Sequence, residues 1–236
     1  MIPLKDDVPC RRTPIVTFAL IAGSVAVFVW QLGYSGSFPR SVAWLGLVPA
    51  DLLSAPGFDP AAPARLPAAA TLLTSMFAHG SLMHIGSNML FLWIFGNNVE
   101  DAMGRVGFLA FYLLCGLGAA AAQIASAPGS TIPMVGASGA IAGVLGAYFL
   151  LYPKARVLAA VPIFIFIRLV WIPAVVFLGL WFVFQILGGL GSSGVGGGVA
   201  FWAHVGGFVA GLILVRPFAG SIWRSPRRSS WGRATW

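Results

Sequence analysis

The sequence predicts an all-α polytopic membrane protein with six transmembrane helices, and three observations support this. Of 236 residues, 58% are hydrophobic and only 8% are charged, whereas soluble domains carry about a quarter charged residues. Several apolar runs approach the roughly 20 residues that cross a bilayer. Basic residues gather outside these runs, with Arg11 and Arg12 before the first and Arg227 and Arg228 after the last. Lipid is therefore the expected solvent.

Hydropathy places the six spans at about residues 14–33, 71–95, 106–126, 136–152, 170–188 and 200–218. Because basic flanks favour the cytoplasmic side, we expect both termini in the cytoplasm, and hence an even number of spans. The first run lacks a small-residue cleavage site and is interpreted as a retained span. The predicted domains are a cytoplasmic segment 1–13, a membrane domain 14–218 and a basic cytoplasmic tail 219–236.

The connections between the spans differ in character. Segment 34–70 is long and rich in proline, and the topology places it on the outer side. Arg168 would cost at least about 2.5 kcal/mol at the bilayer centre, so we expect 157–169 to lie along the cytoplasmic surface, with the fifth span beginning near Val170. The Gly/Ser-rich stretch Gly188–Gly198 predicts a mobile loop.

Other classes of protein fit less well. The net charge of +8 is not arranged as a basic stripe interleaved with aromatic residues, so nucleic acid is not an expected partner. Cys10 and Cys115 indicate no disulfide framework. His79, His84 and His204 offer zinc ligands in principle, but there is no H-E-x-x-H motif and no neighbouring carboxylate. We expect neither a metal nor another cofactor.

Four polar side chains lie inside the predicted spans, where lipid should exclude them. His84 and Asn88 are one helical turn apart in the second span, Ser138 opens the fourth, and His204 lies early in the sixth. Polar groups at this depth need partners or a wet cavity, which makes them functional candidates. The topology places all four in the outer half of the membrane, so we expect them to meet.

Small residues would let the fourth and sixth spans approach closely. Gly139 and Gly143 form one small-x-x-x-small face, and Gly207 and Gly211 form another. Each motif alone also fits an ordinary packing groove, and a lone serine or histidine in a span more often serves helix packing.

The four polar residues together suggest acyl transfer to water. A histidine beside a serine can take the hydroxyl proton, which makes Ser138 the candidate nucleophile and His204 the candidate base. His84, Asn88 and the backbone N–H of Ser138 are candidate oxyanion donors. All six carboxylates fall in loops or at span ends, so a Ser–His dyad is expected in place of a triad. A transporter remains an alternative, although spans one and three carry no ionisable group.

The motifs resemble those of rhomboid intramembrane proteases. The sequence contains H-x-x-x-x-H-x-x-x-N from His79 to Asn88, G-x-S-G from Gly136 to Gly139, and A-H-x-x-G from Ala203 to Gly207. They occur in the family's order, and the resemblance covers roughly residues 14–218. It implies a rhomboid-like six-helix bundle with a water-filled cavity that opens outward.

Carried onto matching positions, the resemblance implies Ser138 as nucleophile and His204 as base. It implies oxyanion or substrate-binding roles for His84, Asn88, Gly136 and Ala137. His79 would shape the start of the second span, Glu100 with Arg105 would form a charged turn, 34–70 would be the first loop, and Gly188–Gly198 would cap the site. Some members have a tyrosine four residues after the serine where this chain has Ala142, which leaves open how His204 is held.

The function implied is an intramembrane serine endopeptidase that acts on transmembrane proteins in the lipid bilayer. The alternative is a non-catalytic rhomboid-like adaptor that binds transmembrane clients. Arg outnumbers Lys, and Ala and Gly are abundant, which favours a bacterial inner membrane. The substrate and the oligomeric state are left open.

Overall fold

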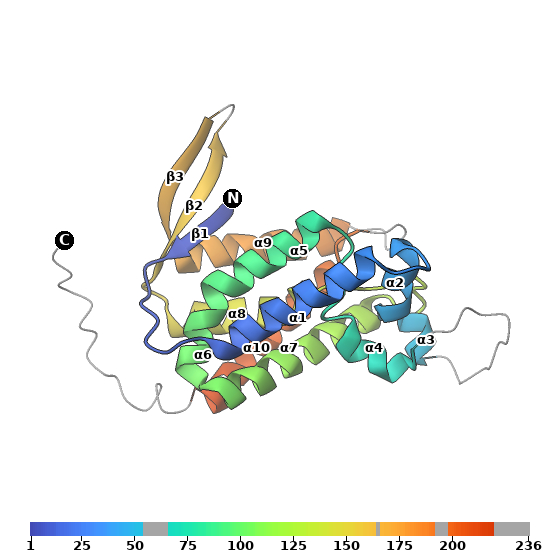
Figure 1. The fold of residues 1–236 in the computed structure, drawn as a ribbon. Coiled ribbons are helices and arrows are strands. Elements are labelled where there is room, and N and C mark those ends of the chain that lie inside the picture. The colour runs from blue at the N-terminus through green and yellow to red at the C-terminus, as the bar shows by residue number, and fades with distance from the viewer. Residues whose placement is uncertain (54–65, 164–165, 192–197, 220–236) are drawn as a thin grey trace.

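The computed structural model describes residues 1–53, 66–163, 166–191 and 198–219, and these are mostly helical (Figure 1). In these parts, four helices are long and apolar enough to cross a membrane: α1 (Ile15–Leu32), α7 (Arg105–Ser126), α9 (Ala174–Gly191) and α10 (Phe201–Phe218). A fifth apolar helix, α8 (Ser138–Leu151), has 14 residues. Spans one, three, four and six were predicted to within two residues of these bounds, but six membrane crossings remain a prediction.

The second predicted span, 71–95, is not one continuous helix in the structure. Residues 68–74 form a separate short helix, α4 (Ala68–Thr74), and the next helix, α5 (Leu82–Phe91), begins only after Ser81. The Ser81 hydroxyl accepts a hydrogen bond from the backbone N–H of His84 at 3.1 Å, which caps the first turn. The helical path continues through a π-helical turn, η1 (Leu92–Gly96), into α6 (Asn97–Met103). The predicted start at residue 71 was therefore wrong.

A three-stranded antiparallel sheet contradicts the all-α prediction. Its strands are β1 (Ile2–Asp6), β2 (Arg156–Ile163) and β3 (Phe166–Pro173), in the order β1-β2-β3. Val157 pairs with Asp6 on one side and Ile172 on the other. The surface segment expected at 157–169 is thus a strand pair, and α9 begins at Ala174 instead of Val170. Dense β-branched residues and Pro162 disfavour a helix here.

The sheet lies beside the start of α9 and projects from the bundle, well away from α2 (Phe38–Leu45) and α3 (Pro49–Leu53) (Figure 1). A carboxylate holds it to the helices, because Asp6 Oδ2 accepts hydrogen bonds from the Tyr148 hydroxyl at 2.5 Å and from Asn98 Nδ2 at 2.6 Å. The chain start is therefore attached to α6 and to the C-terminal end of α8.

Glycine allows α8 to lie in backbone contact with α10. A Cβ atom at Gly207 would fall 2.0 Å from the carbonyl oxygen of Gly139, and one at Gly211 would fall 2.0 Å from that of Gly143. The far side of α8 is equally close to α7, because a Cβ at Gly143 would fall 2.3 Å from Cβ of Cys115. The two glycine faces noted in the sequence thus meet each other, and any larger side chain would force the helices apart.

Polar contacts join the remaining elements. The amide of Gln31, fully buried in α1, donates to the carbonyl of His79 at 3.2 Å and accepts from its N–H at 3.0 Å. Leu47, beyond α2, exchanges two backbone hydrogen bonds with Met134, at 2.9 and 2.8 Å. These contacts fix the segment that follows α1 and the chain just before α8, next to the site.

Candidate functional site

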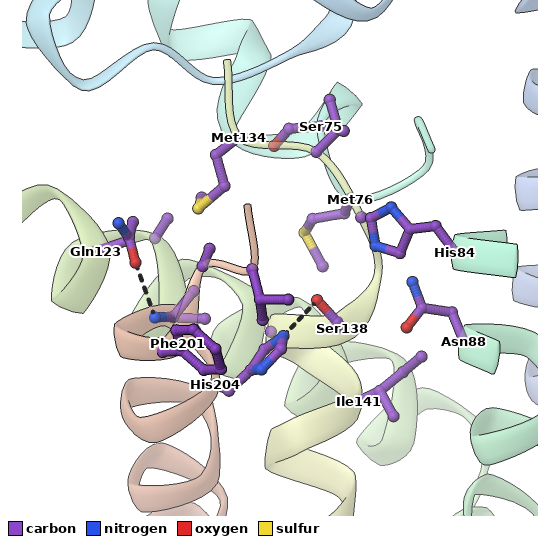
Figure 2. A pocket seen from close by; sticks show the side chains of 18 of the residues that line it. Ser75, Met76, His84, Asn88, Gln123, Met134, Ser138, Ile141, Phe201 and His204 are labelled. Carbon is purple, nitrogen blue, oxygen red and sulfur yellow. Dashed lines mark hydrogen bonds between the residues drawn. The ribbon is translucent and has the colours of Figure 1, made fainter. Parts of the chain in front are cut away.

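The structure brings Ser138 and His204 together. Ser138 is the first residue of α8 and His204 the fourth of α10, and the glycine contact between these helices places Ser138 Oγ 2.8 Å from His204 Nε2 (Figure 2). Both side chains are half-buried. A hydroxyl at hydrogen-bond distance from an imidazole nitrogen is the arrangement that lets the imidazole accept its proton during nucleophilic attack.

The second ring nitrogen of His204 also has a partner. Its Nδ1 lies 2.8 Å from Oε1 of Gln185 on α9, and the ring lies against Trp181, with centroids 5.7 Å apart. Sequence reasoning missed Gln185, although a signal was present. It is the one amide in the apolar helix α9 (residues 174–191), where a polar side chain should attract attention.

His84 and Asn88 of α5 approach the same place from the opposite side. Asn88 is buried, and within the described residues its Nδ2 has no hydrogen-bond partner. His84 Nδ1 accepts a long hydrogen bond, 3.4 Å, from the N–H of Gly80. That contact leaves the proton on Nε2, which faces Gly136. An unpaired buried donor is costly, so Asn88 is available for an acceptor that enters the cavity.

Gly136 provides the space in which these two side chains meet. Its φ is +125°, and a Cβ there would lie 2.6 Å from His84 Nε2 and 3.6 Å from Asn88 Nδ2. Its backbone N–H donates to the carbonyl of Ser75 at 2.8 Å, and Ala137, which follows, is fully buried. The turn Gly136–Ala137 therefore fixes the start of α8, where the N–H of Ser138 has no intrahelical acceptor and the helix dipole is positive.

A cavity of about 880 Å³ joins these groups (Figure 2). Ser138, His204, His84, Asn88 and Gly136 all line it, together with apolar side chains such as Met76 and Ile141. In Figure 2, His84 and Asn88 project from one side and His204 from the other, with Ser138 between them. The volume is in the range of small-molecule and peptide sites. The arrangement can hold a carbonyl group between a nucleophile and fixed hydrogen-bond donors.

Several other predicted residues lie outside this centre. His79 is fully buried before α5, and its ring meets the His84 ring edge-on at 5.1 Å. Glu100 contacts the start of α1, and Ala142 is buried within α8. The capping loop Gly188–Gly198 and the proline-rich segment fall partly on residues 54–65 and 192–197, which lie outside the described residues. Nearly all of the predicted basic tail does too.

The fold and site define a polytopic membrane protein with a hydrogen-bonded serine and histidine at the wall of a cavity. The family model described as Rhomboid domain matches residues 67–220, more than half of the chain. The chain therefore belongs to the rhomboid family, and it is an integral membrane protein.

Named relatives agree with this assignment. The chain is 35% identical over 153 residues to Rhomboid protease GluP of Bacillus subtilis, which covers 64% of this chain and 27% of that protein. It is 28% identical over 150 residues to Rhomboid protein 1, mitochondrial, of Saccharomyces cerevisiae, and the match covers 61% of this chain and 40% of that protein. It is 36% identical over 98 residues to human Presenilin-associated rhomboid-like protein, mitochondrial, and the match covers 40% of this chain and 26% of that protein. The chain thus spans less than half the length of these relatives.

Proposed function

We propose that the protein is an intramembrane serine endopeptidase that hydrolyses peptide bonds in or near transmembrane segments of other membrane proteins. The observation that carries this proposal is the 2.8 Å contact between Ser138 Oγ and His204 Nε2 at the wall of a cavity. A relative that is named a rhomboid protease supports it. In this proposal the bundle has six spans and the cavity opens toward the cell exterior of a bacterial inner membrane.

The reaction follows from the positions of the atoms. Ser138 Oγ attacks the carbonyl carbon of the substrate while its proton passes to His204 Nε2. The tetrahedral oxyanion takes hydrogen bonds from Asn88 Nδ2, from His84 Nε2 and from the backbone N–H of Ser138. As the C–N bond breaks, His204 returns the proton to the departing amine. Water, deprotonated by His204 Nε2, then attacks the carbonyl carbon of the acyl-serine ester. As the C–Oγ bond breaks, His204 returns this proton to Ser138 Oγ, which releases the carboxylic acid and regenerates the hydroxyl.

Water reaches such a centre only through the cavity, since the hydrocarbon core holds none. Ser138 and His204 are each half-buried and line the cavity wall, which is consistent with access for water and for an unwound peptide. A substrate helix must expose its backbone carbonyl before attack, so segments that unwind easily should be cleaved best.

The test is cleavage of a single-span substrate by the purified chain in detergent and in liposomes. We expect cleavage by wild type and none by Ser138→Ala or His204→Ala at unchanged expression. Ser87→Ala is a matched control, because Ser87 also lines the cavity but donates its hydroxyl to the carbonyl of His84 in its own helix. Unchanged cleavage by Ser138→Ala contradicts the proposal.

Labelling with a fluorophosphonate, which reacts with activated serines, separates the enzyme from the alternative adaptor. Labelling of wild type that disappears in Ser138→Ala supports the endopeptidase. A folded wild-type protein that is not labelled, yet retains transmembrane clients, supports the adaptor and contradicts hydrolysis.

A further inference from the structure

Both nitrogens of the His204 ring are held by side chains from different helices. Nε2 contacts the Ser138 hydroxyl on α8, and Nδ1 contacts Gln185 Oε1 on α9, each at 2.8 Å. Gln185 is 9% exposed, so water competes weakly for its amide. A base with two fixed partners has a defined ring orientation and a defined tautomer.

The hydrogen bonds of Gln185 determine which tautomer this is. Its Nε2 lies 3.2 Å from the backbone carbonyl of Trp181, one turn earlier on α9. A carbonyl only accepts, so the nitrogen of the amide must point to Trp181 and the oxygen to His204. The amide oxygen also only accepts, which places the ring proton on Nδ1. The lone pair of Nε2 then faces Ser138, as a general base requires.

We propose that Gln185 is the positioning residue of the reaction, which holds His204 in the Nδ1–H tautomer and directs Nε2 at Ser138. This rests on the proposed endopeptidase function. In a catalytic triad an aspartate accepts the hydrogen bond from the Nδ1–H of the histidine and so orients the ring. Here the neutral amide of Gln185 has this role, which neither a carboxylate nor a tyrosine at the position of Ala142 supplies. A neutral acceptor also avoids the cost of a buried charge inside the membrane.

Two substitutions distinguish the effect of the hydrogen-bond acceptor of Gln185 from the effect of its side-chain size. Gln185→Met keeps the length and removes the acceptor, and we expect kcat to fall roughly 10- to 100-fold with KM little changed, as for other partners that orient a histidine. Gln185→Glu restores an acceptor and adds a negative charge. We expect it to recover most of kcat and to move the acid limb of the pH profile to higher pH, because a carboxylate stabilises the protonated ring.

Gln123→Met is the matched control. Gln123 on α7 also supports α10 through its side-chain oxygen, but it accepts from the backbone N–H of Ala203 at 3.2 Å and does not contact the ring. A purely structural role for Gln185 predicts that both Met variants lower the melting temperature alike and leave the pH profile in place. An unchanged kcat in Gln185→Met, or the same loss in Gln185→Glu, overturns the proposal.

A measurement without turnover keeps this test independent of the proposed function. The chain has three histidines, so ¹⁵N-histidine NMR of the Ser138→Ala protein in micelles can be assigned by substituting His79 and His84. We expect His204 to be protonated on Nδ1 and to become a tautomer mixture in Ser138→Ala/Gln185→Met. A fixed Nδ1–H form that survives Gln185→Met contradicts the role of Gln185, whereas failure of wild type to cleave contradicts only the endopeptidase.

Discussion

The carboxylate of Glu100 caps the first turn of α1 through Thr17. Glu100 Oε2 accepts from the backbone N–H of Thr17 at 2.7 Å and from its hydroxyl at 2.8 Å, and Oε1 accepts from the N–H of Val16 at 3.0 Å. Glu100 is only 3% exposed. A negative charge at a helix N-terminus also meets the positive end of the helix dipole.

Glu100→Gln should therefore destabilise the protein by about 1–3 kcal/mol, since an NH₂ group replaces an acceptor that faces donors. Thermal unfolding in detergent measures this loss. Asp101→Asn is the control, because Asp101 accepts one exposed hydrogen bond from the N–H of Arg11 and should cost much less. Equal melting temperatures for Glu100→Gln and wild type would show that the cap contributes little.

Gly207→Ala should separate α8 from α10. The new methyl group would overlap the carbonyl oxygen of Gly139 at 2.0 Å, and overpacking of this kind costs about 1–3 kcal/mol. Because these helices carry Ser138 and His204, we expect the melting temperature and the rate of fluorophosphonate labelling to fall together. Gly179→Ala in α9 introduces a methyl group with nothing within 4 Å and should leave both unchanged.

Gly136→Ala should impair the oxyanion donors directly. Its φ of +125° disfavours a side chain, and the methyl group would press on His84 Nε2. We expect a strain of about 1–3 kcal/mol together with slower fluorophosphonate labelling. Gly104→Ala has a positive φ of +76° with nothing within 4 Å, so it should lower the melting temperature without slowing the labelling. Equal effects on labelling would argue against a role for the Gly136 turn in the site.

Asp6 should make the attachment of the sheet depend on pH. Burial raises the pKa of the Asp6 carboxyl to about 6, with a smaller contribution from the negative charge of Asp7, against the hydrogen bond from Tyr148, which lowers it. The folded state thus binds the proton more tightly than the unfolded state. The stabilisation is complete below about pH 4 and is lost as the pH rises through about 6.

The pH-dependent stabilisation from Asp6 is expected to be on the order of 1 kcal/mol, once the partial exposure of the carboxyl is allowed for. Melting temperatures of the detergent-solubilised protein between pH 4.5 and pH 8 measure it. Asp6→Asn should flatten this part of the profile, whereas Asp51→Asn, a substitution of an exposed carboxylate, should retain it. A wild-type slope that survives Asp6→Asn would assign the dependence to another group.

The sequence identified the candidate nucleophile and base because lipid makes polar residues conspicuous. Ser138, His204, His84 and Asn88 were predicted to meet, and the structure places them around one cavity. Gln185 was equally conspicuous in an apolar helix and was still missed, because its role depends on the rotation of α9 about its axis. Periodicity says that a residue lies in a helix, but only packing decides which neighbour its side chain reaches.

The sheet and the start of α5 illustrate a second limit. Hydropathy measures how apolar a segment is and not whether it forms a helix or a strand. The cost of burying Arg168 placed 157–169 at the membrane surface, but it did not indicate that this segment forms strands. Its pairing with β1 joins residues 2–6 to residues 156–163, a contact that no local pattern indicates. At α5 the cap by Ser81 decided the boundary, while a hydropathy window averaged across it. Side-chain caps and distant strand pairing are the features that composition cannot locate.

The glycine contact between α8 and α10 has a consequence for how a peptide reaches the cavity. With carbonyl oxygens of one helix set against the Cα atoms of the other, neither helix can slide or turn without steric overlap, so these two form a rigid wall. We therefore expect a peptide to enter the cavity without movement between these two helices, so that the separation of the serine oxygen and the imidazole stays fixed while it binds.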